Sequence, residues 1–191
     1  MTTTTALHWN QLLLDQLEHH WVGQLRPRLD GLTDDEYLWE PVPGAWNVHV
    51  DGDRTTIDFA YPEPVPAPVT TISWRLAHLV VGVLGARNAS HFGGPPADYE
   101  TWTYPATADG ALAQLDDGYA RWVAGVRGLG EEGLARPCGP AEGPYAAEPL
   151  AALVTHIHRE VIHHGAEIAL LRDLYRATGA TGRDSRLVPY P

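Results

Sequence analysis

Residues 156–168 read HIHREVIHHGAEI and lie inside a longer apolar pattern that decides the fold. From position 150 to position 175, apolar side chains recur at alternating spacings of four and three residues, the period of one helix face. The members of this stripe are Leu150, Val154, Ile157, Val161, Ile168, Leu171 and Tyr175. The one gap in the rhythm is filled by His164, so an imidazole stands where a core leucine would be expected.

The polar residues of this stretch include a pair separated by one helical turn. Glu160 and His164 are four residues apart and therefore project from the same face of the helix. Burying an imidazole without a partner costs roughly 1–3 kcal/mol, so His164 requires one. A metal ion bound by both side chains is one candidate. The structural alternative is a hydrogen bond between His164 and a core tyrosine, with Glu160 paired to Arg159 or His163 at the surface.

Three further segments show the same helical period, and together with the first they predict a four-helix bundle. The expected helices cover approximately residues 7–29, 72–91, 107–128 and 147–178. Pro27 lies inside the first helix, where its ring would clash with the preceding turn, so we expect a break near Arg26. The predicted fold class is all-α, with residues 1–191 forming a single bundle domain.

A long irregular insert separates the first two helices. A short helix at 34–39, capped by Thr33, is expected ahead of it. Prolines are dense in the insert, residues 48–70, and no helical period runs through it. Asp51-Gly52 is flanked by residues of high strand propensity, which predicts a small β-hairpin at that turn.

An open metal site needs a third protein ligand from a facing helix. His78 is the best candidate, because no other histidine lies in the middle of a second long helix. Gly82, Gly85 and Ala89 follow it on the same helix face. We expect these small residues to leave space beside His78 for a bound molecule.

The other histidines of the last helix are expected to have supporting or surface roles. His156 shares the face of Glu160 and His164, but it precedes His164 by eight residues. That spacing is a rise of roughly 12 Å, too far for one ion to bind both. His158 and His163 project from other faces of the helix and are not expected to be ligands.

Composition excludes several classes of protein. The chain has 13 basic and 24 acidic residues, a formal net charge of −11, and no cluster of Lys or Arg that could neutralise phosphates. Nucleic acids and anionic membranes are therefore not expected partners. The single cysteine, Cys138, cannot form an internal disulfide, and residues 1–6 lack the features of a secretion signal. This use of cysteine favours a cytoplasmic protein. No window approaches 18 apolar residues, so we expect no membrane-spanning helix.

Three local patterns resemble the DinB/YfiT-like superfamily. They are WEPVPGAW at 39–46, ISWRLAHL at 72–79, and HGAEI at 164–168 with Leu171-Arg172 beyond it. The resemblance implies a four-helix bundle that holds a divalent metal through a histidine of the second helix and a two-ligand pair on the last. Many members use three histidines, whereas the middle position here is Glu160. A His, Glu, His set is similar to that of the N-terminal domain of mycothiol-dependent maleylpyruvate isomerases, and it implies His78, Glu160 and His164 as ligands.

The same resemblance suggests a chemistry without selecting a substrate. Those isomerases carry a further C-terminal domain that 191 residues do not accommodate, so their substrate is not carried over. The leading hypothesis is a metal-dependent transferase, with zinc as the expected ion and nickel or iron as alternatives, that activates a low-molecular-weight thiol such as mycothiol. In this hypothesis Glu167 orients a ligand, and Arg75 or Arg159 holds an acidic group of a small electrophilic substrate.

Two other classes of function stay open at this point. A metal-dependent hydrolase would use the same ion to activate water instead of a thiol. A non-catalytic ligand-binding or stress-response protein would use the bundle to hold a ligand or a partner subunit. Exposed apolar helix faces are compatible with a homodimer.

Overall fold

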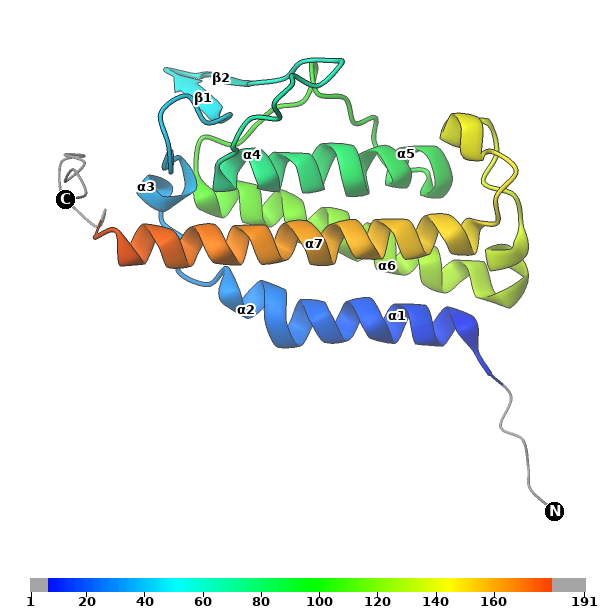
Figure 1. Cartoon of the computed structure of the whole chain (residues 1–191). Coiled ribbons are helices and arrows are strands. Elements are labelled where there is room, and N and C mark those ends of the chain that lie inside the picture. Colours follow the sequence, from blue (N-terminus) through cyan, green and yellow to red (C-terminus); the bar gives the residue numbers. More distant parts are fainter. Residues whose placement is uncertain (1–6, 180–191) are drawn as a thin grey trace.

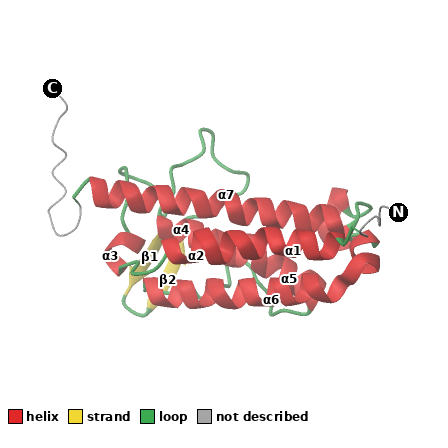
Figure 2. Cartoon of the chain, turned by 90° about the horizontal axis from the view of Figure 1, so that it is seen from below, coloured by secondary structure: helices red, strands yellow, loops and turns green. Residues whose placement is uncertain are grey.

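Four long helices lie side by side in the computed structural model, which describes residues 7–179 (Figures 1 and 2). The first comprises α1 (Trp9–His20), the π-helical η1 (Trp21–Leu25) and α2 (Arg26–Arg28). The second comprises α4 (Ile72–Ala77), the π-helical η2 (His78–Gly85) and α5 (Ala86–Phe92). The others are α6 (Ala108–Ala135) and α7 (Leu150–Ala177). The all-α bundle expected from the sequence is confirmed, whereas the N-terminal threonine run and the tail after Gly179 lie outside the described residues.

The direction of the helices determines how they must be connected. Along the bundle in Figure 1, the second helix and α6 run the same way, opposite to the first helix and α7. Two helices that run parallel cannot be joined by a tight turn, since the chain must return to the starting end. The connection 93–107 therefore passes back along the outside of α4 and α5.

The bundle core is built from the apolar stripes of the helices. Along α7, Ile157, Val161 and Ile168 are buried, as the alternating spacing predicts. The other helices contribute Leu14, Leu17, Leu76, Leu79, Leu84, Leu115, Trp122 and Val126 to the same core. Removing this apolar surface from water is the main stabilising term of such a fold.

Pro27 does not break the first helix near Arg26. The helix continues to Arg28 and caps itself with a bond from the Leu29 N–H to the Arg26 carbonyl. A π-helical turn, η1, ends at Leu25, two residues before the proline. Because a wider turn shifts the hydrogen-bond pattern away from i→i−4, the proline ring is accommodated without ending the helix.

The third helix is longer than its periodicity predicts. It begins after Thr107, whose hydroxyl accepts a hydrogen bond from the Gly110 N–H, as expected for a capping residue. It continues beyond the expected end at Gly128 to Ala135, with one non-helical residue, Gly130, at φ 58°. Glycine adopts this left-handed conformation without steric cost, so the chain resumes a helical turn after it.

A hairpin and a short helix close one end of the bundle. The helix α3 (Asp34–Tyr37) is capped by Thr33, as predicted, although it ends two residues early. The strands β1 (Val48–Asp51) and β2 (Arg54–Ile57) form an antiparallel pair. The turn differs by one residue from the expected Asp51-Gly52. Asp51 pairs with Arg54, so Gly52 and Asp53 occupy the corner, and Gly52 supplies the positive φ of 57° that the turn requires.

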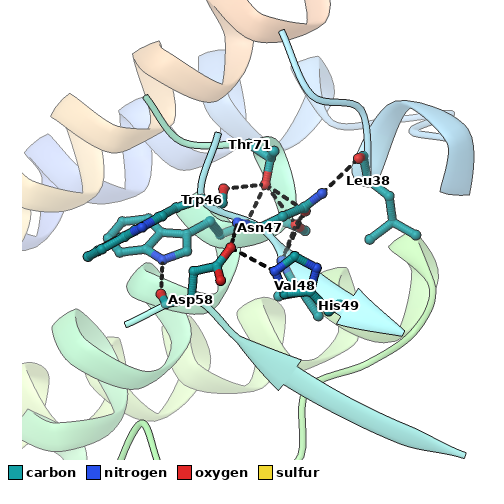
Figure 3. A network of polar contacts seen from close by, with 9 residues as sticks. Leu38, Trp46, Asn47, Val48, His49, Asp58 and Thr71 are labelled. Atoms are coloured by element: carbon teal, nitrogen blue, oxygen red, sulfur yellow. Dashed lines mark hydrogen bonds and ion pairs between the residues drawn. The ribbon is translucent and has the colours of Figure 1, made fainter. Parts of the chain in front are cut away.

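Buried Asn47 ties this end of the bundle to the start of α4 (Figure 3). Its side-chain amide donates to the Leu38 carbonyl at 3.0 Å, and its side-chain oxygen accepts from the Thr71 hydroxyl at 2.9 Å. Thr71 is also the N-cap of α4, accepting a hydrogen bond from the Trp74 N–H. The indole of Trp74 in turn donates to the Asp58 carbonyl at 2.8 Å. The network fixes the residue at which α4 begins, and thereby the position of His78 along the axis of the bundle.

A second anchor at the same end is a buried ion pair. The guanidinium of Arg172, on α7, donates to both carboxylate oxygens of Glu36, on α3, at 2.6 and 3.0 Å. The remaining amino group donates to the backbone carbonyls of Arg28 and Asp30. Bidentate pairing together with carbonyl acceptors satisfies a charge that would otherwise be costly to bury. The pair joins α7 to the segment that follows the first helix.

Replacing Glu36 with alanine should destabilise the protein strongly, because it leaves the Arg172 charge buried without a partner. We expect a loss of about 3–5 kcal/mol in the free energy of unfolding, measured by urea denaturation. Glu18→Ala is the matched control, since Glu18 pairs with Arg127 in a more exposed position and should cost less than about 1 kcal/mol. Similar losses in the two variants would contradict the assignment of the buried pair as an anchor.

Candidate metal centre

His78 lies where α4 passes into the π-helical segment η2. Turns of this type inside α-helices are frequent at functional sites. The imidazole stacks on Trp74 with ring centroids 5.4 Å apart, and its Nδ1 lies 2.6 Å from the hydroxyl oxygen of Tyr99. Burial is the largest cause that lowers the pKa of His78, to about 3. The ring is therefore neutral at physiological pH, the form in which histidine binds metals.

His164 is buried on the facing helix α7, with 7% of its surface exposed. Its Nδ1 lies 2.7 Å from Oε2 of Glu167, and its Nε2 lies 3.4 Å from Oε2 of Glu160. The ring meets that of His78 edge to face, with centroids 4.7 Å apart and an interplanar angle of 88°. His164 thus contacts the imidazole of His78 on the facing helix and the carboxylate of Glu160 on its own helix, although the ligand atoms of these three described residues do not all lie within 4.8 Å of one another.

Glu160 stands between this buried pair and the surface. Its Oε2 is the atom near His164, whereas its Oε1 lies 3.4 Å from Nδ1 of His156 and 3.5 Å from Nε of Arg159. Arg159 also contacts Nδ1 of His156 at 2.6 Å. The carboxylate therefore offers one oxygen to the buried imidazole of His164 and the other to groups that face solvent.

The two candidate arginines occupy different environments. Arg75 is half-buried beside His164, with Nε 3.1 Å from Oε2 of Glu167 and its guanidinium carbon 5.4 Å from the ring centroid of Trp74. Burial is the largest effect on its pKa and lowers it, while the charge of Glu167 acts in the opposite direction. The side chain of Arg159, in contrast, is 67% exposed. Of these two arginines, only Arg75 contacts His164, with Nη1 3.4 Å from Nδ1 of the imidazole.

A second group of ligand atoms shares His164. Within residues 7–179, His163, His164 and Glu167 each offer one atom such that all three lie within 4.8 Å of one another. Nε2 of His163 is 3.4 Å from Oε1 of Glu167, and the side chain of His163 is 62% exposed. This group opens to solvent on the outer side of α7, whereas His78 approaches His164 from the facing helix.

The small residues after His78 leave no space beside His78 itself, whereas Gly85 lines a cavity of about 380 Å³ that His78 does not line. A Cβ at Gly82 would lie 2.2 Å from the hydroxyl oxygen of Tyr99, and one at Gly85 would lie 2.8 Å from the Cβ of Ala97. The returning connection 93–107 thus fills the volume that we expected to hold a bound molecule. The glycines are visible in the sequence, but the residue opposite them depends on how the connection folds back, so sequence analysis missed Tyr99.

His158 is buried, so of the two roles expected for it, supporting or surface, the surface role is wrong. It is 1% exposed and packs edge to face against Trp122, with ring centroids 6.2 Å apart. Among the described residues, neither of its ring nitrogens has a hydrogen-bond partner of good geometry, although the backbone of Leu13 lies close enough to oppose the effect of burial on its pKa. Burial lowers the pKa of His158 to about 4. The helix α7 therefore buries two imidazoles, those of His158 and His164. The apolar periodicity of the sequence predicted only the burial of His164.

The comparisons with known proteins agree with the bundle. A family model described as the DinB superfamily matches residues 16–168, a span that includes His78, Glu160 and His164. No curated protein and no solved structure matches the chain. Among the helices described, none is both long and apolar enough to cross a membrane.

The buried His158 should make the protein less stable in mild acid. Unfolded histidine takes up a proton near pH 6.5, whereas folded His158 does so only near pH 4, so protonation favours the unfolded chain between these values. As the pH is lowered from 6.5 to 4, the free energy of unfolding should therefore fall. The protonation of His158 should account for a loss on the order of 3 kcal/mol. Urea denaturation at several pH values, with a chelator present, measures it.

His158→Leu should remove this part of the pH dependence. His19→Leu is the control, because His19 is exposed on α1 and should leave the dependence unchanged. An unaltered slope in the His158 variant would show that the buried ring is not the group that titrates.

Proposed function

This chain belongs to the DinB superfamily, and we propose from that premise that it is a divalent-metal-dependent transferase. The proposed ligands are His78, Glu160 and His164, and the proposed ion is zinc, with nickel or iron as alternatives. The proposed reaction joins a low-molecular-weight thiol of the mycothiol type to a small electrophilic molecule. The observation that supports the proposal is the position of the buried His164, which contacts both the half-buried imidazole of His78 on the facing helix and the carboxylate of Glu160.

The donor set suits a divalent ion. Each buried ring has one nitrogen near another side chain, Tyr99 for His78 and Glu167 for His164, which leaves its second nitrogen available. Metal-bound histidines characteristically donate their other N–H to such a partner, which fixes the tautomer and the ring orientation. Two neutral imidazoles and one carboxylate would leave a net charge of about +1 on a divalent ion.

The thiol has to come from outside the protein. The single cysteine, Cys138, is buried in the loop between α6 and η3 (Pro140–Tyr145), and its N–H and that of Gly139 are bonded to the Glu148 and Ala146 carbonyls. Burial also raises the pKa of its thiol. When bound, a divalent ion lowers the pKa of a coordinated thiol and so favours the nucleophilic thiolate near neutral pH.

The surrounding residues support this chemistry by orienting groups. Glu167 accepts a hydrogen bond from the Nδ1–H of His164 and so presents Nε2 toward Glu160. Arg75 pairs with the same carboxylate of Glu167, and its side chain remains partly exposed to solvent. We therefore assign to Arg75, rather than to the outward-facing Arg159, the binding of an acidic substrate group.

The metal itself provides the first test. Purified wild-type protein should carry about one divalent ion per chain, and His164→Ala should carry almost none, since one of three protein ligands is lost. His78→Ala and His163→Ala then distinguish the two groups of ligand atoms. We expect loss of metal in the first variant and retention in the second, measured by elemental analysis. The reverse result would place the ion in the outer group, and a metal-free wild type would refute the proposal.

The dependence of turnover on added thiol provides the second test. Loaded protein should convert small electrophiles only when a low-molecular-weight thiol is present, with product that contains a new carbon–sulfur bond detected by mass spectrometry. Turnover without thiol would instead identify a hydrolase that activates water. Arg75→Met should raise the KM for acidic substrates about tenfold or more, whereas Arg159→Met should leave it unchanged.

A further inference from the structure

We propose that Tyr99 is a positioning residue that sets the tautomer and the ring orientation of His78. The inference deepens the proposed function and rests on it where it concerns metal affinity. Tyr99 comes from the connection 93–107, outside the four long helices, and its hydroxyl oxygen lies 2.6 Å from Nδ1 of His78. That contact occupies one ring nitrogen and leaves Nε2 as the atom that can bind a metal.

Tyr99 is itself held in place from two sides. Its ring stacks on that of Phe59, from the insert, with centroids 4.6 Å apart and an interplanar angle of 14°. Its backbone carbonyl accepts a hydrogen bond from the Tyr104 hydroxyl at 2.7 Å. A side chain fixed at both its ring and its backbone can hold a partner in one orientation, as a mobile surface tyrosine could not.

The backbone of η2 is built to admit the hydroxyl. A Cβ at Gly82 would lie 2.2 Å from Oη of Tyr99 and 3.2 Å from Nδ1 of His78, so any larger residue would force the two apart. Glycine inside a helix costs about 1 kcal/mol relative to alanine. At this position the missing methyl group makes room for the contact between Tyr99 and His78.

The chemical consequence concerns a single proton. Neutral imidazole carries its proton on either Nδ1 or Nε2, and only the unprotonated nitrogen can bind a metal. A tyrosine hydroxyl can either donate to Nδ1 or accept from it, and the proposal is that Oη of Tyr99 accepts, so that the proton of His78 stays on Nδ1 and Nε2 is free. Trp74, stacked on the same imidazole at 5.4 Å, restricts the tilt of the ring but has no bearing on its proton.

Tyr99→Phe tests the inference by removing the hydroxyl alone. We expect the wild-type metal-free protein to show His78 protonated at Nδ1 in histidine-selective ¹⁵N NMR, with the signals assigned by their loss in His78→Gln. In Tyr99→Phe the population should shift toward the Nε2-protonated form that free histidine prefers. Zinc affinity, measured by competition with a chelator, should fall about 10–100-fold.

Two further variants make the result specific. Tyr119→Phe is the matched control, because Tyr119 lies on α6 and stacks on Trp21 at 3.8 Å. It should change neither the tautomer nor the affinity. Gly82→Ala keeps every ring and should act like Tyr99→Phe by displacing the hydroxyl; urea denaturation establishes that both variants are folded.

The inference fails in either of two ways, each separable from failure of the proposed function. A wild-type His78 protonated at Nε2, or a Tyr99→Phe variant with wild-type tautomer and affinity, would overturn it. If the wild type binds no metal, the proposed function is refuted. The tautomer measurement, made on metal-free protein, still decides whether Tyr99 positions His78.

Discussion

The candidate site depends on polar partners for the imidazoles that lie between its helices, in contrast to His158, whose buried ring nitrogens have none among the described residues. Two imidazoles, those of His78 and His164, are packed edge to face between η2 and α7, where water does not solvate them freely. An unpartnered polar group in such a place costs roughly 1–3 kcal/mol. In this protein, Tyr99 is the partner of His78 and Glu167 is the partner of His164. Arg75 in turn pairs with the charge of Glu167. The candidate site and its supporting groups form one hydrogen-bonded unit.

The topology of the bundle explains why side chains from outside the four long helices lie beside His78. Because the second helix and α6 run parallel, the connection 93–107 must return along the bundle, and this return carries Tyr99 past His78. The insert contributes Phe59 to the opposite side of Tyr99. The network around Asn47 sets the start of α4, so segments that look irregular in the sequence determine the geometry of a helical site.

Charge burial divides the molecule into two regions with different roles. At the end closed by α3, the ion pair between Arg172 and Glu36 is fully enclosed and bidentate, an arrangement suited to joining elements. Closer to the middle of α7, the carboxylates of Glu160 and Glu167 remain partly exposed and lie beside the imidazole of His164. Only the second arrangement leaves donor atoms that a ligand could use, which separates the structural anchor from the candidate metal centre.

Periodicity by itself determined the helices, their buried faces and the presence of an imidazole within the stripe of α7, because these depend on spacing along one element. It also brought Glu160 and His164 onto one face. Tertiary structure alone decided the burial of His158 and the pairing of His78 with Tyr99. Those features depend on contacts between segments distant in the chain, and a hydrogen bond across such a distance leaves no periodic trace in the sequence.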